Sequence, residues 1–139
     1  ETLPKHPITS GVRPFEIGDE WYFNIRFRPE GKGVTPILVA KPDDKTRQGV
    51  SASPRGPYKH IVEAKGREEV LAWAVERPDG GRGFGFTGGH DHTNWGDPNF
   101  RKLALNAILW TAGLDVPAEG VSSDVTAGEL KQNLDPKKK

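Results

Sequence analysis

The sequence predicts an α/β domain that is rich in strands and carries one buried helix near its C-terminus. Three observations lead to this prediction. Aromatic and branched side chains alternate over residues 20–27, two strand-like runs flank the turn sequence Pro78-Asp79-Gly80-Gly81, and helix start and stop signals enclose residues 98–112. A period of two residues is typical of strands, and a period near 3.6 is typical of helices. The 139 residues fit a single domain.

The composition excludes several classes of function. There is no cysteine, so the chain has no disulfide, no thiolate metal site and no cysteine nucleophile. Basic and acidic residues number 20 and 19, and three of the basic ones are the terminal lysines, so we expect no nucleic-acid partner. No long apolar run predicts a membrane span. The chain opens with Glu1 rather than methionine, so we interpret it as processed, excised or incompletely represented, and its compartment cannot be deduced.

The first part of the chain predicts a loop followed by two strands. His6 precedes a proline and is therefore expected to be extended. In residues 20–27, one strand face would carry four apolar side chains: Trp21, Phe23, Ile25 and Phe27. A second strand is predicted at 34–40, where Pro36 indicates a sheet edge or a strand start because it lacks an N–H donor.

The middle of the chain predicts a long loop and a β-hairpin. Residues 41–60 are polar and contain three prolines, so we interpret them as a functional or poorly ordered loop with His60 exposed. The runs 68–77 and 82–88 are predicted to pair as a hairpin because the Pro-Asp-Gly-Gly sequence suits a tight turn. Glycines alternate with phenylalanines in the second run, which leaves one strand face bare for close approach by another element.

The helix over residues 98–112 has the most complete local signals. Asp97 is a typical N-cap residue, Pro98 suits the first helical position, and Gly113 suits a left-handed helix end. Apolar residues occupy more than one stripe, so the helix is expected to be largely buried, with Arg101, Lys102 and Asn106 on its solvent side. Beyond it, residues 122–139 form a polar tail with a capping-box spacing at 126–129 that predicts a short helix to about residue 134.

The loop Gly88–Trp95 holds most of the candidate functional residues. His90 follows two glycines, and its imidazole suits an acid, a base or a metal ligand, although a structural brace is the alternative. In an extended segment His92 would lie on the same side as His90, so the two could share a divalent metal. A third ligand would then be needed from His6, Asp19 or Glu20.

The remaining candidates are aromatic, amide and acidic side chains. Trp95 and Asn94 could provide a platform and a hydrogen-bonding group for a sugar, or Trp95 could simply cap the buried helix. Asp19 and Glu20 could close a turn, or they could line a site, with Asp19 binding substrate and Glu20 acting as an acid or base.

These features together resemble the ThuA-like (trehalose-utilisation-type) family. The resemblance covers residues 2–121 and rests on the His-Pro start, Asp-Glu before the aromatic run, Ala-Trp in the hairpin and Gly-Gly-His before the capped helix. It implies a flavodoxin-like sandwich of the class I glutamine-amidotransferase type, of which this chain would form the C-terminal part. It also places His90 where that superfamily has its triad histidine. Without a cysteine, the resemblance implies a sugar-related role rather than glutamine hydrolysis.

Three functional hypotheses follow. The chain could be an enzyme acting on a sugar or an oxidised sugar through His90 and Glu20, with His92, Asn94, Trp95 and Asp19 contacting the substrate. It could be a non-catalytic module that binds a carbohydrate or a partner. It could also be an inactive fragment whose apolar surfaces pair with another copy or with a missing N-terminal half.

Overall fold

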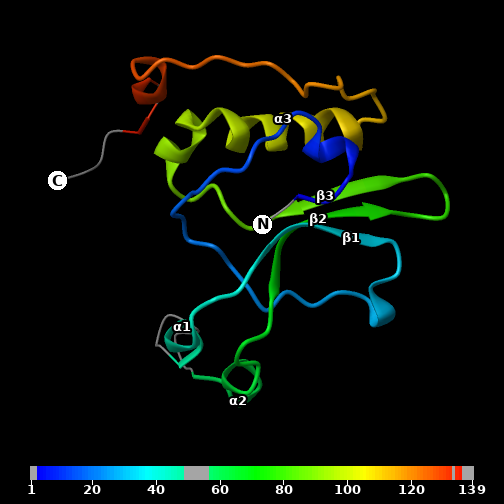
Figure 1. Ribbon diagram of the computed structural model, residues 1–139, viewed down its shortest axis with the longest axis vertical. Helices are drawn as coiled ribbons and strands as arrows, with labels where there is room; N and C mark the ends of the chain where they lie inside the picture. The colour runs from blue at the N-terminus through cyan, green and yellow to red at the C-terminus, as the bar shows by residue number, and fades with distance from the viewer. Residues whose placement is uncertain (1–2, 49–56, 133, 136–139) are drawn as a thin grey trace. The chain divides into compact units, whose positions relative to one another are not determined.

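The computed structural model describes residues 3–48, 57–132 and 134–135 (Figure 1). The strands are β1 (Val34–Ala40), β2 (Glu69–Glu76) and β3 (Arg82–Phe86), and the α-helices are α1 (Asp44–Gln48), α2 (Lys59–Val62) and α3 (Pro98–Thr111). Short 3-10 turns are η1 (Pro7–Thr9), η2 (Pro29–Gly31), η4 (His92–Gly96) and η5 (Glu129–Lys131). This content confirms the predicted α/β class. In the part of the chain that the structure describes, no helix has the length and apolar character needed to cross a membrane.

The chain divides into two compact units. Unit 1 consists of the described residues within 1–20 and 88–139, and unit 2 consists of those within 21–87. The sequence predicted a family domain over residues 1–121 and a polar tail over residues 122–139. This division stays a prediction, because the two units are defined by their compactness and not by family boundaries. Each unit is described by itself below.

Unit 2 is built on an antiparallel sheet in the order β1-β2-β3. The predicted hairpin is confirmed, with β2 and β3 in a register that pairs Ala72 with Phe86. Its turn is closed by a hydrogen bond from the Arg77 N–H to the Gly81 carbonyl at 2.8 Å. Gly80 has φ +82°, a value that glycine adopts without steric cost. No parallel pair occurs among the described strands, so the flavodoxin-like sheet is not seen in them.

The glycines of β3 leave one face of the strand without side chains, and another element closely approaches this face as predicted. Trp73 of β2 is paired with Gly85 in the sheet, and its indole lies where a Gly85 side chain would project. The Phe27 ring packs edge-on against the same indole, with centroids 5.2 Å apart. A side chain at residue 85 would displace this aromatic pair, so the glycine is required by packing.

The strand predicted at residues 20–27 is wrong. The segment joins no sheet ladder, and Asn24, with φ +62°, interrupts the strand geometry. The Asn24 backbone N–H donates to the Glu69 carboxylate at 3.2 Å instead of to a neighbouring strand. The alternating aromatic side chains still pack on the hairpin, as when Trp21 meets Phe86 edge-on at 5.6 Å.

The predicted loop at 41–60 is only partly irregular. It contains α1 and the start of α2, and residues 49–56 lie outside the described part. His60 is exposed as predicted, but Arg47 of α1 is 0% exposed. A charged side chain buried so completely needs partners, and these come from residues distant in sequence.

Unit 1 is organised around α3. The helix starts as predicted, with the Asp97 side chain accepting hydrogen bonds from the N–H groups of Asn99 and Phe100 at 2.8 and 2.9 Å. It ends as predicted before Gly113, which has φ +76°. The apolar core of this unit includes Ile8 of η1 together with residues of α3: Phe100, Leu103, Ala107 and Trp110.

Two expectations about α3 are corrected. Ile108 is 63% exposed, so the helix is not covered on all its apolar sides. Asn106 was assigned to the solvent side but is 0% exposed. Its amide donates to the carbonyls of Ile8 and Ser10 and accepts from the Val121 N–H, at 2.8–3.0 Å. It is buried because it satisfies backbone groups that would otherwise lack partners.

The C-terminal part confirms the capping box but not the length of the helix. The Thr126 N–H donates to the Glu129 carboxylate at 2.8 Å, and the Glu129 N–H donates to the Thr126 hydroxyl at 3.2 Å. The helix that follows is only the 3-10 turn η5, not a helix to residue 134. From its charge we expect the lysine tail, Lys137–Lys139, to be disordered, and this prediction concerns residues outside the described part.

Candidate functional site

One carboxylate from the N-terminal segment of unit 1 binds the first half of the Gly88–Trp95 loop. Asp19 accepts hydrogen bonds from three consecutive backbone N–H groups, those of Gly89, His90 and Asp91, at 2.7, 3.1 and 3.2 Å. Gly89 has φ +93°, which allows the loop to curl round the carboxylate. Such a concave run of N–H groups is a typical anion-binding nest, and here the anion is part of the protein.

The electrostatics of Asp19 follow from these contacts. Burial by itself would raise the pKa of its carboxyl. Hydrogen bonds from the Gly89 N–H, the Asn94 side chain and the N–H groups of Asp91 and Glu20 outweigh burial and lower the pKa below its ordinary value. Asp19 is therefore ionised at neutral pH, and its oxygens accept hydrogen bonds from the loop.

Glu20 and His90 are brought together by this arrangement. The Glu20 Oε2 lies 3.6 Å from the His90 Nδ1, and both side chains are well exposed, at 61% and 56%. The two residues predicted to be catalytic are far apart in the sequence, yet they are neighbours because Asp19 adjoins Glu20 and binds the N–H of His90. A carboxylate beside one imidazole nitrogen favours the tautomer with the proton on that nitrogen.

The other loop residues have structural partners. His92 Nε2 lies 3.0 Å from the Leu130 carbonyl, to which it donates, so this nitrogen is not available to a metal in this arrangement. Asn94 Nδ2 donates to the Gly18 carbonyl at 2.8 Å and to Asp19 at 3.0 Å. The Asn94 amide thus links the loop to both Gly18 and Asp19 of the N-terminal segment.

Trp95 lies at the junction of the loop and α3. Its half-buried ring packs edge-on against Phe100 with centroids 4.9 Å apart, and its carbonyl accepts a hydrogen bond from Arg101 at 2.7 Å. Trp95 therefore does cap the helix. Contact of its remaining exposed surface with a sugar stays a prediction.

Comparison with protein families gives one decisive match. The family model described as "ThuA: Trehalose utilisation" matches residues 2–111. The chain belongs to the ThuA family. Neither the curated proteins nor the solved structures compared with this ThuA-family chain gave a significant match.

The predicted metal site of this ThuA-family protein lacks a converging ligand set. Among the described residues, no group of three or more His, Asp or Glu side chains is arranged to hold a metal ion. The nearest partner of His90 is Glu20, whereas that of His92 is a backbone carbonyl. His6, a proposed third ligand, uses Nδ1 to accept from the Ile8 N–H, and its ring packs 4.9 Å from Trp110.

A cavity in unit 1 does not coincide with the loop. Its volume is about 430 Å³, and it is lined by the N-terminal segment: Leu3, Pro4, Lys5, His6, Thr9, Ser10, Val12 and Pro14. Of the predicted site and metal-ligand residues, only His6 borders it. The candidate site is the loop, because the Glu20 and His90 side chains meet there.

The sequence did not show which residues of this ThuA-family site hold the loop in place through hydrogen bonds. Asp19 was predicted to bind substrate, whereas the structure gives it five hydrogen bonds from the loop and its own neighbour. Arg101 was assigned to the solvent side of α3, whereas it ties Trp95 to Ser123. No local sequence signal distinguishes such roles, because each contact joins residues remote in the chain or depends on a turn.

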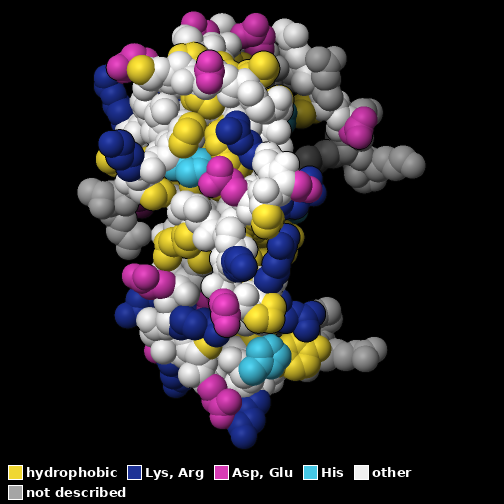
Figure 2. All heavy atoms as spheres, turned by 90° about the vertical axis from the view of Figure 1, so that its right-hand side faces the viewer, with side chains coloured by type: hydrophobic (Ala, Val, Ile, Leu, Met, Phe, Trp, Pro, Cys, Tyr) yellow, Lys and Arg dark blue, Asp and Glu magenta, His cyan; other side chains and the backbone are white. Residues whose placement is uncertain are grey.

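The surface charge gives no argument for a polyanionic partner. On the face drawn in Figure 2, Lys and Arg side chains are interspersed with Asp and Glu side chains among the described residues. This mixing agrees with the near balance of 20 basic and 19 acidic residues in the sequence.

Proposed function

We propose that this ThuA-family protein binds a sugar or an oxidised sugar at the Gly88–Trp95 loop and acts on it by acid–base chemistry. The observation that supports the proposal is the approach of the Glu20 carboxylate to His90 Nδ1 at 3.6 Å on an exposed edge. The family's description, trehalose utilisation, supports a sugar as the substrate class.

The chemistry follows from the pairing. Glu20 stabilises a proton on His90 Nδ1, which leaves Nε2 as the basic nitrogen. Nε2 would take a proton from a sugar hydroxyl, or from a carbon next to the carbonyl of an oxidised sugar, and the resulting imidazolium would return a proton to the product. Glu20 would stabilise the imidazolium charge while it exists.

The rest of the loop is proposed to position this pair. Asp19 fixes the backbone of His90, and Asn94 fixes Asp19. The exposed part of the Trp95 ring would lie against the apolar face of a sugar ring. Asp19 and Asn94 would thus assist the reaction mainly by holding the loop in one conformation.

The architecture beyond the described sheet is also a proposal. We propose that the hairpin and α3 belong to a flavodoxin-like sandwich of the class I glutamine-amidotransferase type. Family membership and the chain order of hairpin, Gly-Gly-His loop and capped helix support this assignment.

Turnover of a sugar panel tests the function. The protein is incubated with trehalose, glucose and their keto derivatives, and substrate loss is followed by proton NMR. Replacing His90 with glutamine should lower kcat/KM by about 10²–10⁴, the usual contribution of a positioned acid–base group. Glu20→Gln should lower it by about tenfold, because the imidazole is retained but the imidazolium is less stabilised.

The matched control is Asp91→Asn, an exposed side chain in the same loop. It should leave turnover unchanged. Equal turnover by the wild type and His90→Gln would reject the proposed chemistry. No turnover by the wild type together with saturable sugar binding would instead favour the non-catalytic module.

A further inference from the structure

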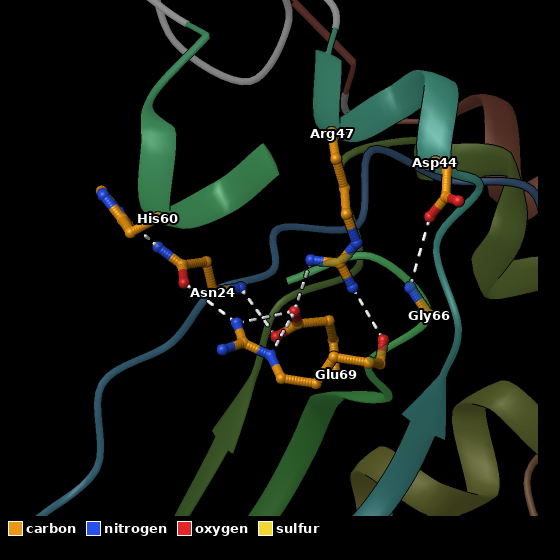
Figure 3. Close-up of polar contacts among 7 residues, drawn as sticks. Asn24, Asp44, Arg47, His60, Gly66 and Glu69 are labelled. Atoms are coloured by element: carbon orange, nitrogen blue, oxygen red, sulfur yellow. Dashed lines mark hydrogen bonds and ion pairs between the residues drawn. The ribbon is translucent and has the colours of Figure 1, made fainter. Parts of the chain in front are cut away.

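Unit 2 contains a buried charge cluster centred on Glu69 (Figure 3). Glu69 is 5% exposed, and its Oε1 accepts from Arg47 Nη1 at 2.7 Å and from Arg67 Nε and Nη2 at 3.0 and 2.8 Å. Its Oε2 accepts from the backbone N–H of Asn24 at 3.2 Å. All the arginine donors that Glu69 accepts therefore converge on Oε1, and its single negative charge is shared between two guanidinium groups.

The cluster carries an excess positive charge. Two guanidinium groups share the one Glu69 carboxylate, and arginine keeps its proton in proteins. Arg47 is 0% exposed, and its Nε has no hydrogen-bond partner among the described residues. The Phe23 ring, with its centroid 5.4 Å from the Arg47 guanidinium carbon, adds a cation–π attraction but no negative charge. The open side of the cluster is the side where the half-exposed Arg67 lies. An anion bound there would neutralise the remaining positive charge.

Two carboxylates of the segments that carry α1 and α2 have other partners. Asp44 of α1 accepts from the Gly66 N–H at 3.3 Å, on a different side of Arg47 from Asn24 and His60 (Figure 3). Glu63, which follows α2, lies 3.6 Å from the ammonium group of Lys59. Neither carboxylate is paired with Arg67.

The open side of the cluster presents three donors. The Arg67 side chain is 50% exposed, and its Nη2 donates to Asn24 Oδ1 at 3.1 Å. This bond orients the Asn24 amide so that Nδ2 lies 3.4 Å from His60 Nε2 (Figure 3). Stacking on Tyr58, with centroids 5.8 Å apart, supports the His60 ring.

The contact between Asn24 and His60 is at the long limit for a hydrogen bond. The amide nitrogen always donates, and the imidazole nitrogen donates in one neutral tautomer and in the charged form. An oxyanion that accepts from both would replace this marginal contact with two good hydrogen bonds. Arg67 Nη1 has no hydrogen bond to the described residues and would supply a third, charge-assisted one.

We propose that Arg67, Asn24 and His60 form a binding site for a phosphate group. Three donors approach from three side chains, which suits the terminal oxygens of a phosphate. The phosphate charge balances a cluster that otherwise carries one guanidinium too many. The proposal is independent of the sugar chemistry assigned to the Gly88–Trp95 loop, because it involves none of the same residues.

The test is an NMR titration with inorganic phosphate at constant ionic strength, followed on ¹⁵N-labelled protein. We expect saturable shifts at the Asn24 side-chain amide and the Arg67 Nε–H. Asn24→Gly keeps the φ of +62° accessible and removes only the amide, and should weaken binding about fivefold, the value of one hydrogen bond. Arg67→Lys keeps the charge but loses the fork, and should weaken binding about tenfold.

Two matched variants serve as controls. Arg77→Lys changes an arginine that is 57% exposed and paired with Asp79, and Glu30→Gly changes the other non-glycine residue with positive φ, +63°. Neither should change the dissociation constant. The absence of saturable shifts, or equal shifts with chloride alone, would overturn the proposal, as would full binding by Arg67→Lys and Asn24→Gly.

The source of the phosphate is distinguished by a second arm with glucose 6-phosphate. Tighter binding than inorganic phosphate would identify a phosphorylated sugar as the ligand, whereas equal binding would identify the phosphate group itself. Both results support the site. Binding of glucose 6-phosphate without shifts at Asn24 and Arg67 would contradict it.

Discussion

Removing the Asp19 carboxylate is expected to release the Gly88–Trp95 loop. In Asp19→Ala, the exposed N–H groups of Glu20, His90 and Asp91 can bond to water at little cost. The partly buried donors, Gly89 N–H and Asn94 Nδ2, lose a charged acceptor. At about 1 kcal/mol for each, the loop loses about 2 kcal/mol, which makes its opening about 30-fold more frequent.

Amide hydrogen exchange measures this effect directly. The exchange of the Gly89 amide, and of its neighbours in the loop, should accelerate by about 30-fold in Asp19→Ala. Asp79→Ala is the control, since Asp79 accepts from the Gly81 N–H in the hairpin turn of unit 2. It should leave exchange in the loop unchanged. Unaltered protection of Gly89 in Asp19→Ala would refute the role assigned to the carboxylate.

Three further predictions concern stability. Replacing Asn106 by leucine should lower the free energy of unfolding by about 3 kcal/mol, because the backbone partners of Asn106 lose their hydrogen bonds. Urea denaturation measures this loss, and a change under about 0.5 kcal/mol would contradict the prediction. Glu69→Gln leaves the buried Arg47 charge uncompensated and should cost about 3–5 kcal/mol by the same assay; a neutral effect would argue against the ion pair. Burial alone would raise the pKa of Glu69, but hydrogen bonds from Arg47 and Arg67, and the charge of Arg67, lower the pKa below the ordinary 4.5. The pKa of Glu69 is lower in the folded protein than in the unfolded chain, so its stabilisation is complete above about pH 4.5 and is lost as the pH falls through the folded pKa. The wild type should show this acid-dependent loss of stability, and Glu69→Gln should not.

The elements that the sequence predicted correctly are those with local signals. The hairpin follows from its Pro-Asp-Gly-Gly turn, and α3 follows from the cap at Asp97 and the stop at Gly113. In both cases the residues that determine the structure lie within a few positions of one another. The strand predicted at residues 20–27 failed because a contact from Asn24 to Glu69, 45 residues away, outweighs the local pattern.

The candidate site shows the same limit. The composition of the Gly88–Trp95 loop and the family resemblance indicated His90 and Glu20, and the structure places the two side chains side by side. The sequence could not show that Asp19 is occupied by the loop, since an acidic residue before an aromatic run looks the same in either role. The Glu69 cluster was missed for a related reason: its two arginines come from separate segments and meet only through the fold.

The proposed function depends on sugar binding at the Gly88–Trp95 loop. An NMR titration of the labelled wild-type protein with trehalose and with oxidised sugars tests it most directly. We expect saturable shifts at the backbone amides of residues 88–95 and at the His90 imidazole, lost or weakened in Asp19→Ala. Saturable shifts confined to other residues, or no saturable shift with any sugar, would contradict it.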